Sequence, residues 1–450
     1  MEKQSTLKRV VLTVAAVLGS SLLGYGQETG GASIDTGDTA WMLTATLLVL
    51  LMCLPGLALF YGGLVRSKNV LSIFVQCFAM AGVMSLLWVA LGYSVAAGSG
   101  DGSNAYFGWD SNFLFLKHIN EGLIMEGGTI PESVWVTFQM TFIIISPAII
   151  VGAFAERMKF SAVLIFTVLW TVLSYLPMWH MVWGGGLFNG GDEGNWLMGA
   201  HQHALDFAGG NVVHINAGIA GLVACLFVGN RKGFPGPTLV PHNVPFVLIG
   251  AALLWVGWFG FNAGSAGGAN GSAGMAMLTT QIATAAALVV WMGIEWLVSK
   301  KPTAVGAATG AVAGLVAITP AAGSTDIMGA MAIGAISSIV CYLAATKLKH
   351  KFNYDDSLDV FGVHGVGGIV GALLTGVFIR EGFDGPVGGC MQLWVQAKSV
   401  IITAGWSAVA ASIALTVAKF LCRGLRVDED VEHGGLDLSD HGEEAYGSDS

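Results

Sequence analysis

Charged residues are scarce in this sequence, and the patterns of most metal, redox and hydrolytic sites are missing. Lys, Arg, Asp and Glu make up only 11% of the 450 residues, whereas a soluble domain carries roughly 25%. The six cysteines have no CxxC spacing and lie mostly in apolar stretches, which is typical of packing residues. The HExxH motif and any complete nucleophile arrangement are absent, so we expect neither an enzyme nor a bound cofactor. The net charge of −9 comes from acidic loops and an acidic tail, and it does not indicate nucleic-acid binding.

Long apolar runs dominate what is present. The chain is 54% hydrophobic and contains 64 glycines. Apolar stretches of about 20 residues recur, each long enough to cross a hydrocarbon core about 30 Å thick. We therefore expect an all-α integral membrane protein with eleven spans after the N-terminal segment. The spans are residues 39–64, 69–97, 133–155, 160–183, 211–229, 243–262, 275–299, 303–319, 325–346, 361–379 and 393–421.

The first 26 residues have the pattern of a cleaved signal peptide. Lys3, Lys8 and Arg9 precede an apolar run that is too short to span a membrane, and small residues follow it before Gln27. The alternative is an uncleaved first helix. Cleavage would place the mature N-terminus outside.

The basic residues predict the orientation. Of the 20 Lys and Arg residues, three lie in the N-terminal segment and fourteen at alternate span ends. Only Lys117, Arg380 and Lys398 fall on the other side. Because cytoplasmic loops of membrane proteins carry an excess of Lys and Arg, the N-terminus should lie outside and the C-terminus in the cytoplasm.

Two histidines lie within spans made otherwise of glycine and aliphatic residues, His214 in VVHINAGIAG and His364 in VFGVHGVGGIVG. An ionisable side chain inside a membrane is costly and indicates a functional site. Each histidine is followed by glycine at the fourth and seventh positions and by isoleucine at the fifth. These residues are Gly218, Ile219 and Gly221 after the first histidine, and Gly368, Ile369 and Gly371 after the second. The matching segments favour a duplicated transporter with its pathway between the two halves.

Several strings are more specific than composition. They are PGLALFYGGLVRSKNVLS from Pro55, GAFAERMKFSA from Gly152, ALDFAGGNVVHINAGIAGL from Ala204, GWFGFNAGSAG from Gly257 and DVFGVHGVGGIVG from Asp359. In these strings the chain resembles the ammonium transporter family, Amt/Mep/Rh. ALDFAGG and FGFNAGS are similar to the microbial and plant Amt branch rather than to the Rhesus branch.

The resemblance implies a fold of eleven helices, with an inverted five-plus-five repeat and one extra C-terminal helix. It also implies a homotrimer in a bacterial-type inner (plasma) membrane, with a narrow pore for ammonium or ammonia through each subunit and methylammonium as an analogue. The transmembrane domain would cover residues 38–422. The cytoplasmic tail, 423–450, would fold against the membrane domain and help to dock a PII-type regulator similar to GlnK. Membrane lipids are the other expected partners.

The resemblance also implies roles for named residues. Trp183, Phe142 and Ser265 would form an external vestibule that binds ammonium, partly by a cation–π interaction worth about 0.5–2 kcal/mol. Phe142 and Phe261 would stack as a gate, and the two histidines would line the lumen beneath it.

The chemistry of the histidine pair allows more than one role. Desolvation opposes a charged imidazole, so at least one ring should stay neutral near pH 7. A neutral pair can pass a proton along or accept N–H from ammonia. The alternative is a purely structural role, in which both buried histidines form hydrogen bonds with backbone carbonyls. A metal site is discounted because no third ligand accompanies them.

Two aspartates precede the histidines. Asp206 can cap the helix that carries His214, or it can contact ammonium, and we favour capping. Asp359, five residues before His364, is expected to cap the second histidine helix in the same way.

Two other functions remain possible. One is an ammonium sensor of the same fold that signals through its tail, and the other is a Rhesus-like channel for neutral gas, which Trp183 disfavours. The sequence does not decide whether net transport carries charge. The connection 184–205 is longer than expected; its His201 and His203 could bind a metal, although a solvated loop is the better interpretation.

Overall fold

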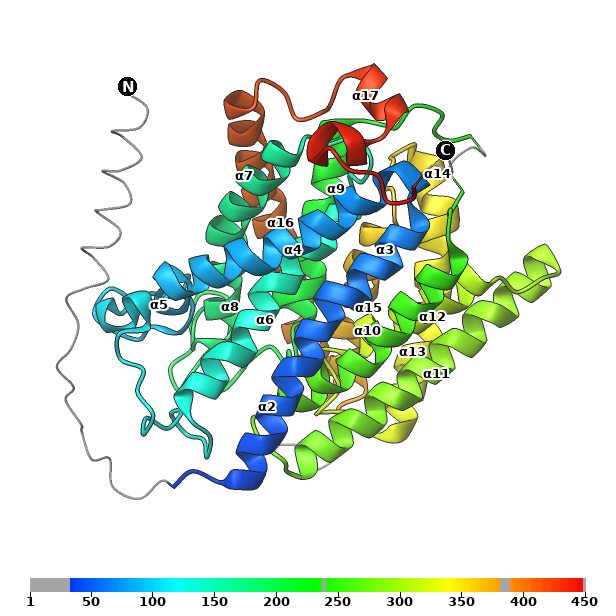
Figure 1. The fold of residues 1–450 in the computed structure, drawn as a ribbon. Helices are drawn as coiled ribbons and strands as arrows, with labels where there is room; N and C mark the ends of the chain where they lie inside the picture. The colour runs from blue at the N-terminus through cyan, green and yellow to red at the C-terminus, as the bar shows by residue number, and fades with distance from the viewer. Residues whose placement is uncertain (1–32, 237–239, 381–388, 448–450) are drawn as a thin grey trace, which may run out of the picture. The chain divides into compact units, whose positions relative to one another are not determined.

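The computed structural model describes residues 33–236, 240–380 and 389–447. The predicted signal peptide, residues 1–26, lies outside the described residues. Within them the chain forms helices and loops, with isolated β-bridges and no β-strand (Figure 1). The α-helices are α2 (Thr36–Leu51), α3 (Ala58–Leu64), α4 (Val70–Leu87), α5 (Tyr93–Ala97), α6 (Glu132–Val151), α7 (Phe160–Trp170), α8 (Leu176–Trp183), α9 (Asn216–Val228), α10 (Val244–Gly264), α11 (Gly271–Ser299), α12 (Ala304–Ile318), α13 (Ile327–Leu343), α14 (Lys349–Phe352), α15 (Val366–Val377), α16 (Cys390–Leu421) and α17 (Glu429–Gly434). Tighter or wider turns continue several of them: η1 (Met52–Leu57), η2 (Ser67–Asn69), η3 (Trp88–Gly92), η4 (Ser111–Leu116), η5 (Thr171–Tyr175), η6 (Gly210–Ile215), η7 (Ala344–Leu348), η8 (Phe361–Gly365) and η9 (Asp437–His441).

The helices have the length and composition of a multi-pass membrane protein. In the described ranges, nine continuous helical stretches are long and apolar enough to cross a membrane. Two shorter apolar helices, Ala304–Ile318 and Phe361–Val377, coincide with the predicted spans 303–319 and 361–379. The predicted all-helical membrane fold is confirmed, while the count of eleven spans and the inverted repeat stay predictions.

Several predicted span boundaries differ from the helices by three residues or more, two of them at the C-terminal end. The stretch predicted as 133–155 ends at Val151, because the chain turns at Gly152, where an added Cβ would lie 2.7 Å from the ring of Tyr61. The stretch predicted as 325–346 continues through η7 and α14 to Phe352.

Glycine allows the helices to approach closely. Helix α10 packs against α2 and α3, and Gly250 of α10 lies directly on the backbone of Phe60, which leaves no room for a side chain. Without a hydrophobic drive between helices in lipid, such close contact of small residues is the main source of packing energy. Helix α16 runs along α7, α9 and α15.

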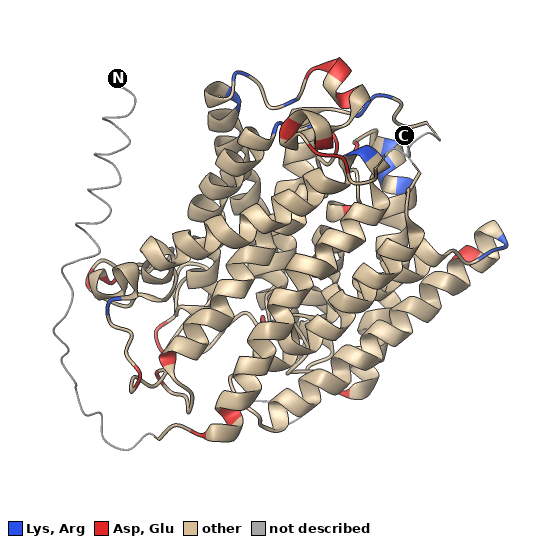
Figure 2. Cartoon of the chain, viewed as in Figure 1, with Lys and Arg blue, Asp and Glu red and all other residues tan. Residues whose placement is uncertain are grey.

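Lys and Arg residues lie mostly at one end of the helices. Most of the blue segments in Figure 2 lie at the end that carries α17, which we call the tail end. Arg66 and Lys232 are at this end, and both are bonded to residues of the tail. Trp183 is the last residue of α8, and Asp206 lies beside it in the loop before η6; we call this opposite end the Trp183 end.

Candidate functional site

The two histidines contact each other inside the protein. His214 lies in η6 and His364 in η8, with 1% and 5% of their surfaces exposed. Their Nδ1 atoms are 3.3 Å apart. In a neutral pair one Nδ1–H donates to the other Nδ1, so the accepting ring carries its own proton on Nε2. The Nε2 atom of His214 is buried without a hydrogen-bond partner.

The repeated glycines explain why the histidines can meet. Gly218 lies against the backbone of Gly365 so closely that a Cβ would not fit. Reciprocally, a Cβ on Gly368 would lie 3.1 Å from the Cβ of His214. The glycine four residues after each histidine therefore packs against the segment that carries the other histidine. Both histidines lie in wide helical turns, η6 and η8, a feature that is frequent at functional sites.

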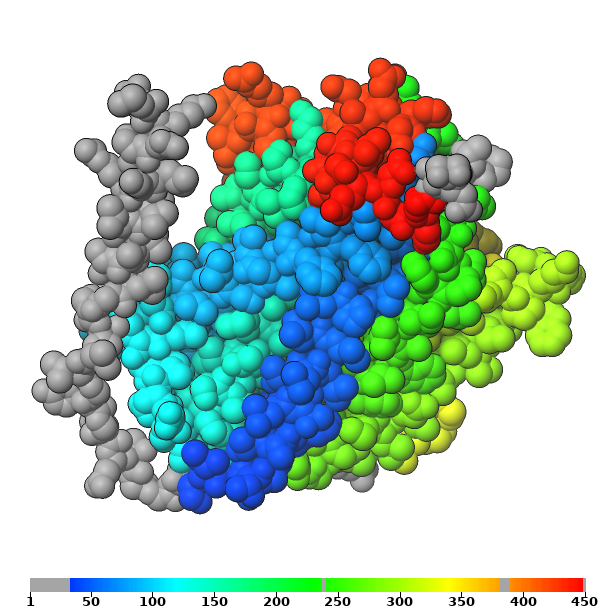
Figure 3. All heavy atoms as spheres, viewed as in Figure 1, coloured from blue at the N-terminus to red at the C-terminus, as the bar shows by residue number. Residues whose placement is uncertain are grey.

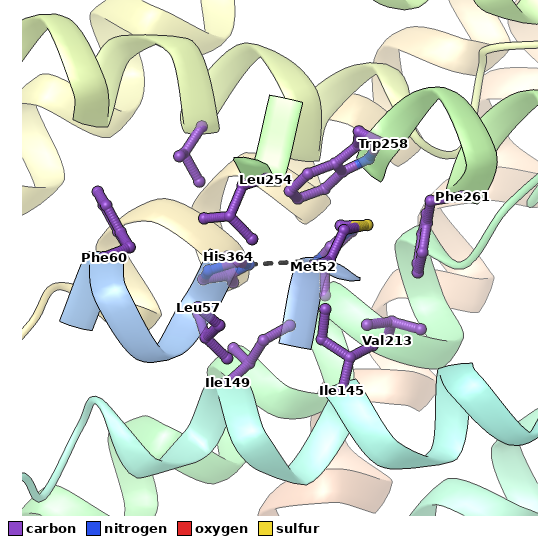
Figure 4. Close-up of a pocket in the computed structure, with 12 residues that line it drawn as sticks. Met52, Leu57, Phe60, Ile145, Ile149, Val213, Leu254, Trp258, Phe261 and His364 are labelled. Atoms are coloured by element: carbon purple, nitrogen blue, oxygen red, sulfur yellow. Dashed lines mark hydrogen bonds between the residues drawn. The ribbon is translucent and has the colours of Figure 1, made fainter. Parts of the chain in front are cut away.

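A narrow cavity runs past the histidine pair (Figure 4). Its empty volume is about 330 Å³, and besides the two histidines its lining is apolar. Figure 4 shows aliphatic and aromatic side chains pointing into it, with Phe261 and Phe60 toward opposite ends. A second, more open cavity of about 1010 Å³ adjoins it, and His364, Phe60 and Val312 line both. Because the second cavity also contacts Arg231 and Lys349, the two cavities together extend from the histidine pair toward the tail end.

Two phenylalanines close the other end of the narrow cavity. Phe142 of α6 and Phe261 of α10 stack with ring centroids 4.1 Å apart and planes 14° apart, and both are buried. The ring of Phe261 is 6.0 Å from that of His214. On the far side, Phe142 meets the partly exposed Trp183 edge to face at 6.2 Å. The structure thus brings together the aromatic residues that the resemblance singled out.

Ser265 and two further aromatic residues lie next to the residues Phe142, Phe261 and Trp183. Ser265 caps the end of α10, is partly exposed, and donates its hydroxyl to the carbonyl of Phe261 at 2.8 Å, which leaves its oxygen free to accept a hydrogen bond. Phe138 lies 5.0 Å from Phe142, and Trp179 lies 5.7 Å from Trp183. Sequence reasoning missed these two, although both are one helical turn from a residue it named.

Asp206 caps the turn that carries His214. Its carboxylate is buried and accepts hydrogen bonds from the amides of four successive residues, 209 to 212, among them Gly209 at 2.9 Å and Asn211 at 2.7 Å. These are the amides that a helix start leaves without partners. The backbone carbonyl of Asp206 accepts from the indole N–H of Trp183 at 2.8 Å. Asp206 therefore ties Trp183 to the start of the histidine helix.

The prediction that Asp359 caps the second histidine helix is wrong. The cap is Asp356, whose carboxylate accepts from the amides of Val360 at 3.0 Å and Phe361 at 2.7 Å. Asp359 has a positive φ of 59°, and its carboxylate instead bonds to Lys349 and lines the open cavity. The sequence carried a signal for the correct residue, because Asp356 precedes His364 by eight positions, as Asp206 precedes His214.

The stability of two variants distinguishes Asp356 from Asp359 as the helix cap. Asp356→Asn should lower the free energy of unfolding by about 1–3 kcal/mol, because an amide group would face a buried backbone N–H without an acceptor. Asp359→Asn should cost less than about 1 kcal/mol, since the amide oxygen can still accept from Lys349 and the side chain is partly exposed. Thermal unfolding of the purified variants measures both. An equal or larger loss with Asp359→Asn would contradict the assignment.

A chain of buried ion pairs joins loops at the tail end. Glu156 lies 3.1 Å from Arg66 and 3.2 Å from Arg231, and Arg231 lies 2.8 Å from Asp355. Burial raises the pKa of Glu156, but Arg231 and Arg66 outweigh it and the pKa is lowered overall. Burial and the nearby Asp359 raise the pKa of Asp356. From the sequence, Arg66 and Arg231 indicated only which side of the membrane their loops occupy. Their acidic partners could not be predicted.

The tail folds onto the same loops (Figure 3). The carboxylate of Glu432 accepts from the backbone N–H of Lys232 at 2.9 Å and from Arg426 at 2.7 Å. The carboxylate of Asp437 accepts from the amide of Ser72 at 2.8 Å near the start of α4. Within the described residues the tail, 423–447, is therefore packed against these loops.

The connection 184–205 is an ordered loop. His201 is exposed and lies 3.6 Å from Asp192, and the carbonyl of His203 accepts from Gln392 at 3.1 Å. Among the residues that the structure describes, no group of three His, Cys, Asp or Glu side chains is placed to hold a metal ion.

Comparisons with known proteins cover nearly the whole chain. The sequence model of the Ammonium Transporter Family matches residues 40–446. An ammonium transporter of Aquifex aeolicus is 49% identical over 95% of this chain and 96% of its own length. One from Bacillus subtilis is 44% identical over 92% of this chain and 99% of its own. Among solved structures, a sensor Amt protein superposes with a TM-score of 0.81 at 29% identity, covering 90% of this chain and 98% of its own. Candida albicans Mep2 superposes with a TM-score of 0.79 at 31% identity, covering 90% and 92%.

Proposed function

Since the chain belongs to the ammonium transporter family, a family of transporters rather than enzymes, we propose how it moves ammonium. Ammonium binds at Trp183, Phe142 and Ser265, loses its proton, and crosses as ammonia past His214 and His364 into the cytoplasm. The observation that carries this proposal is the apolar cavity, closed by stacked phenylalanines at one end and lined by the histidine pair.

The apolar lining supplies the selectivity. Ammonium and potassium have similar charge and size, so a rigid cation cage would separate them poorly. A dry passage penalises any ion that keeps its charge, because burying an unpaired charge costs several kcal/mol or more. Ammonium alone can leave its proton behind and continue as a neutral molecule.

The histidine pair offers the proton a separate route. The Nδ1–Nδ1 contact lets one proton be shared between the rings, and the unpartnered Nε2 of His214 gives a second point of exchange. If the proton crosses through this pair and water, net transport carries one positive charge for each ammonia.

The binding site above the phenylalanines suits a small cation. The face of Trp183 attracts ammonium by a cation–π interaction worth about 0.5–2 kcal/mol. Its indole N–H is engaged with the carbonyl of Asp206, which holds the ring in place. The oxygen of Ser265 can accept an N–H of the ion.

For the membrane arrangement we propose what the sequence predicts. We propose eleven spans in residues 38–422, formed as an inverted five-plus-five repeat with α16 as the additional helix. After removal of residues 1–26, the N-terminus lies outside the inner membrane and the tail, 423–450, lies in the cytoplasm. The functional unit is a homotrimer, and the folded tail presents a surface for a PII-type regulator.

A second candidate is an ammonium sensor that binds at the same site and signals through its tail. Two observations favour it: the tail is folded onto the loops at its end of the bundle, and one similar solved structure is a sensor Amt protein.

Uptake by lipid vesicles that contain only this protein separates the two candidates. A transporter accumulates labelled methylammonium, and unlabelled ammonium competes with it. Binding of methylammonium to the protein without uptake above that of empty vesicles would reject transport and favour the sensor.

A further inference from the structure

Helix α16 carries a line of buried polar side chains. The line consists of Gln392, Gln396, Ser399, Thr403 and Ser407, each fully buried. The spacing of four, three, four and four residues places them on one face of the helix. Buried polar side chains in a membrane span are costly and form hydrogen bonds across helix interfaces.

Gln396 forms the tightest part of this line. Its side-chain oxygen accepts from the backbone N–H of Leu205 at 2.7 Å, and its side-chain nitrogen donates to the carbonyl of Leu205 at 2.8 Å. The same nitrogen donates to the carbonyl of Ala372 in α15 at 2.9 Å. One side chain thus holds both backbone groups of the residue before Asp206 and links them to the helix of the second histidine.

Three other residues of this line form hydrogen bonds with residues that follow Asp206 in the chain. Ser399 and Thr403 bond to the side chain of Asn211, at 3.4 Å and 3.2 Å. The hydroxyl of Ser407 donates to the carbonyl of Asn216 at 2.6 Å. The bonds therefore reach both sides of Asp206 and His214 in the chain.

Both histidine segments are capped by a buried aspartate, but their other contacts differ. At the tail end, the segment before His364 is fixed by charged groups, through Arg231 on Asp355 and Lys349 on Asp359. At the Trp183 end, the contacts from α16 to residues 205–216 are all made by neutral side chains. Fixed neutral groups can hold the loop next to the cation site without adding a charge that competes for the ion.

We propose that Gln396 is a positioning residue for transport, which sets the loop of Asp206 and through it the ring of Trp183 and the turn of His214. This inference rests on the proposed transport function. Helix α16 lies outside the proposed repeat, and through Gln396 it joins the loop before Asp206 to α15, which continues the helix of the second histidine.

Two variants test the proposal in purified protein in vesicles. Gln396→Leu removes all the hydrogen bonds and should lower the turnover of ammonium transport about 10- to 100-fold, since a shift of about 1 Å in a positioned group costs up to about 100-fold. Gln396→Glu keeps the shape. A neutral carboxyl group can accept from the N–H of Leu205 and donate its O–H to a carbonyl, whereas the ionised form has no donor. Burial favours the neutral form, so this variant should lose activity relative to wild type as the pH is raised and regain it reversibly as the pH is lowered.

The control is Thr416→Val on the same helix, where the hydroxyl bonds only to the carbonyl of Ser412 one turn earlier. Wild type and Thr416→Val should show the same dependence of transport rate on pH. If the wild type itself does not transport ammonium, the proposed function is wrong. If both transport normally, the inference about Gln396 fails when Gln396→Glu shows the wild-type profile, or when its activity stays low at acid pH. It also fails if Gln396→Leu transports within twofold of wild type.

Discussion

His214→Asp gives a protein that conducts potassium. In the wild type the ring of His214 is buried in an apolar cavity and its Nε2 has no partner, so a persistent cation meets no compensating charge there. A carboxylate at this position draws in water and pairs with a cation that keeps its charge. His364→Asp should act in the same way, because His364 lines both the narrow and the open cavity. The proposed binding site at Trp183 is unchanged in both variants.

The measurement is growth, or current, with potassium as the only permeant cation, together with a check that the protein reaches the membrane. His201→Asp is the matched control, since it makes the same substitution on an exposed loop and should conduct no potassium. Variants at both His214 and His364 that remain ammonium-selective and electrogenic would show that the pair is structural and that the proton travels elsewhere.

Asp206→Ala abolishes transport. The substitution leaves four successive amides in a buried segment without their acceptor, at about 1–3 kcal/mol for each one that finds no other partner. The turn of His214 should then unwind or shift, and the carbonyl that holds Trp183 shifts with it. Asp206→Asn keeps one acceptor oxygen and should retain more stability than the alanine variant.

Transport and thermal unfolding of the same preparations check this expectation. Asp326→Ala is the matched control, because Asp326 caps α13 through the amide of Gly329, away from the histidine cavity. It should cost about 0.5–2 kcal/mol of stability, as for a typical helix cap, with transport retained. Normal transport by Asp206→Ala at normal expression would remove Asp206 from the mechanism.

The membrane fold could be predicted from the sequence because its signal is local. About 20 consecutive apolar residues suffice to indicate a span, and the described helices overlap the predicted ranges, with boundaries that differ by a few residues. His214 and His364 could be singled out because ionisable residues are rare inside membranes. Trp183, Phe142 and Phe261 could not, since many of the chain's aromatic residues have similar surroundings in sequence, and only the resemblance selected them.

Other parts of the site depend on contacts between distant residues. Asp356 was missed because Asp359 is nearer to His364, although the spacing of eight residues from Asp206 to His214 pointed to Asp356. Gln396 was missed for a different reason. Its partners are backbone groups of Leu205, 191 positions away, and a glutamine in a span does not reveal which backbone it will meet.

The central claim is that ammonium leaves its proton at the mouth and that the proton crosses separately through the histidine pair. Current recorded from vesicles of purified protein on a solid-supported membrane tests it most directly. A pulse of ammonium should give a transient positive current into the vesicles, and an equal pulse of potassium almost none. Accumulation of ammonia in the same vesicles without any current would show electroneutral conduction and contradict the proton relay.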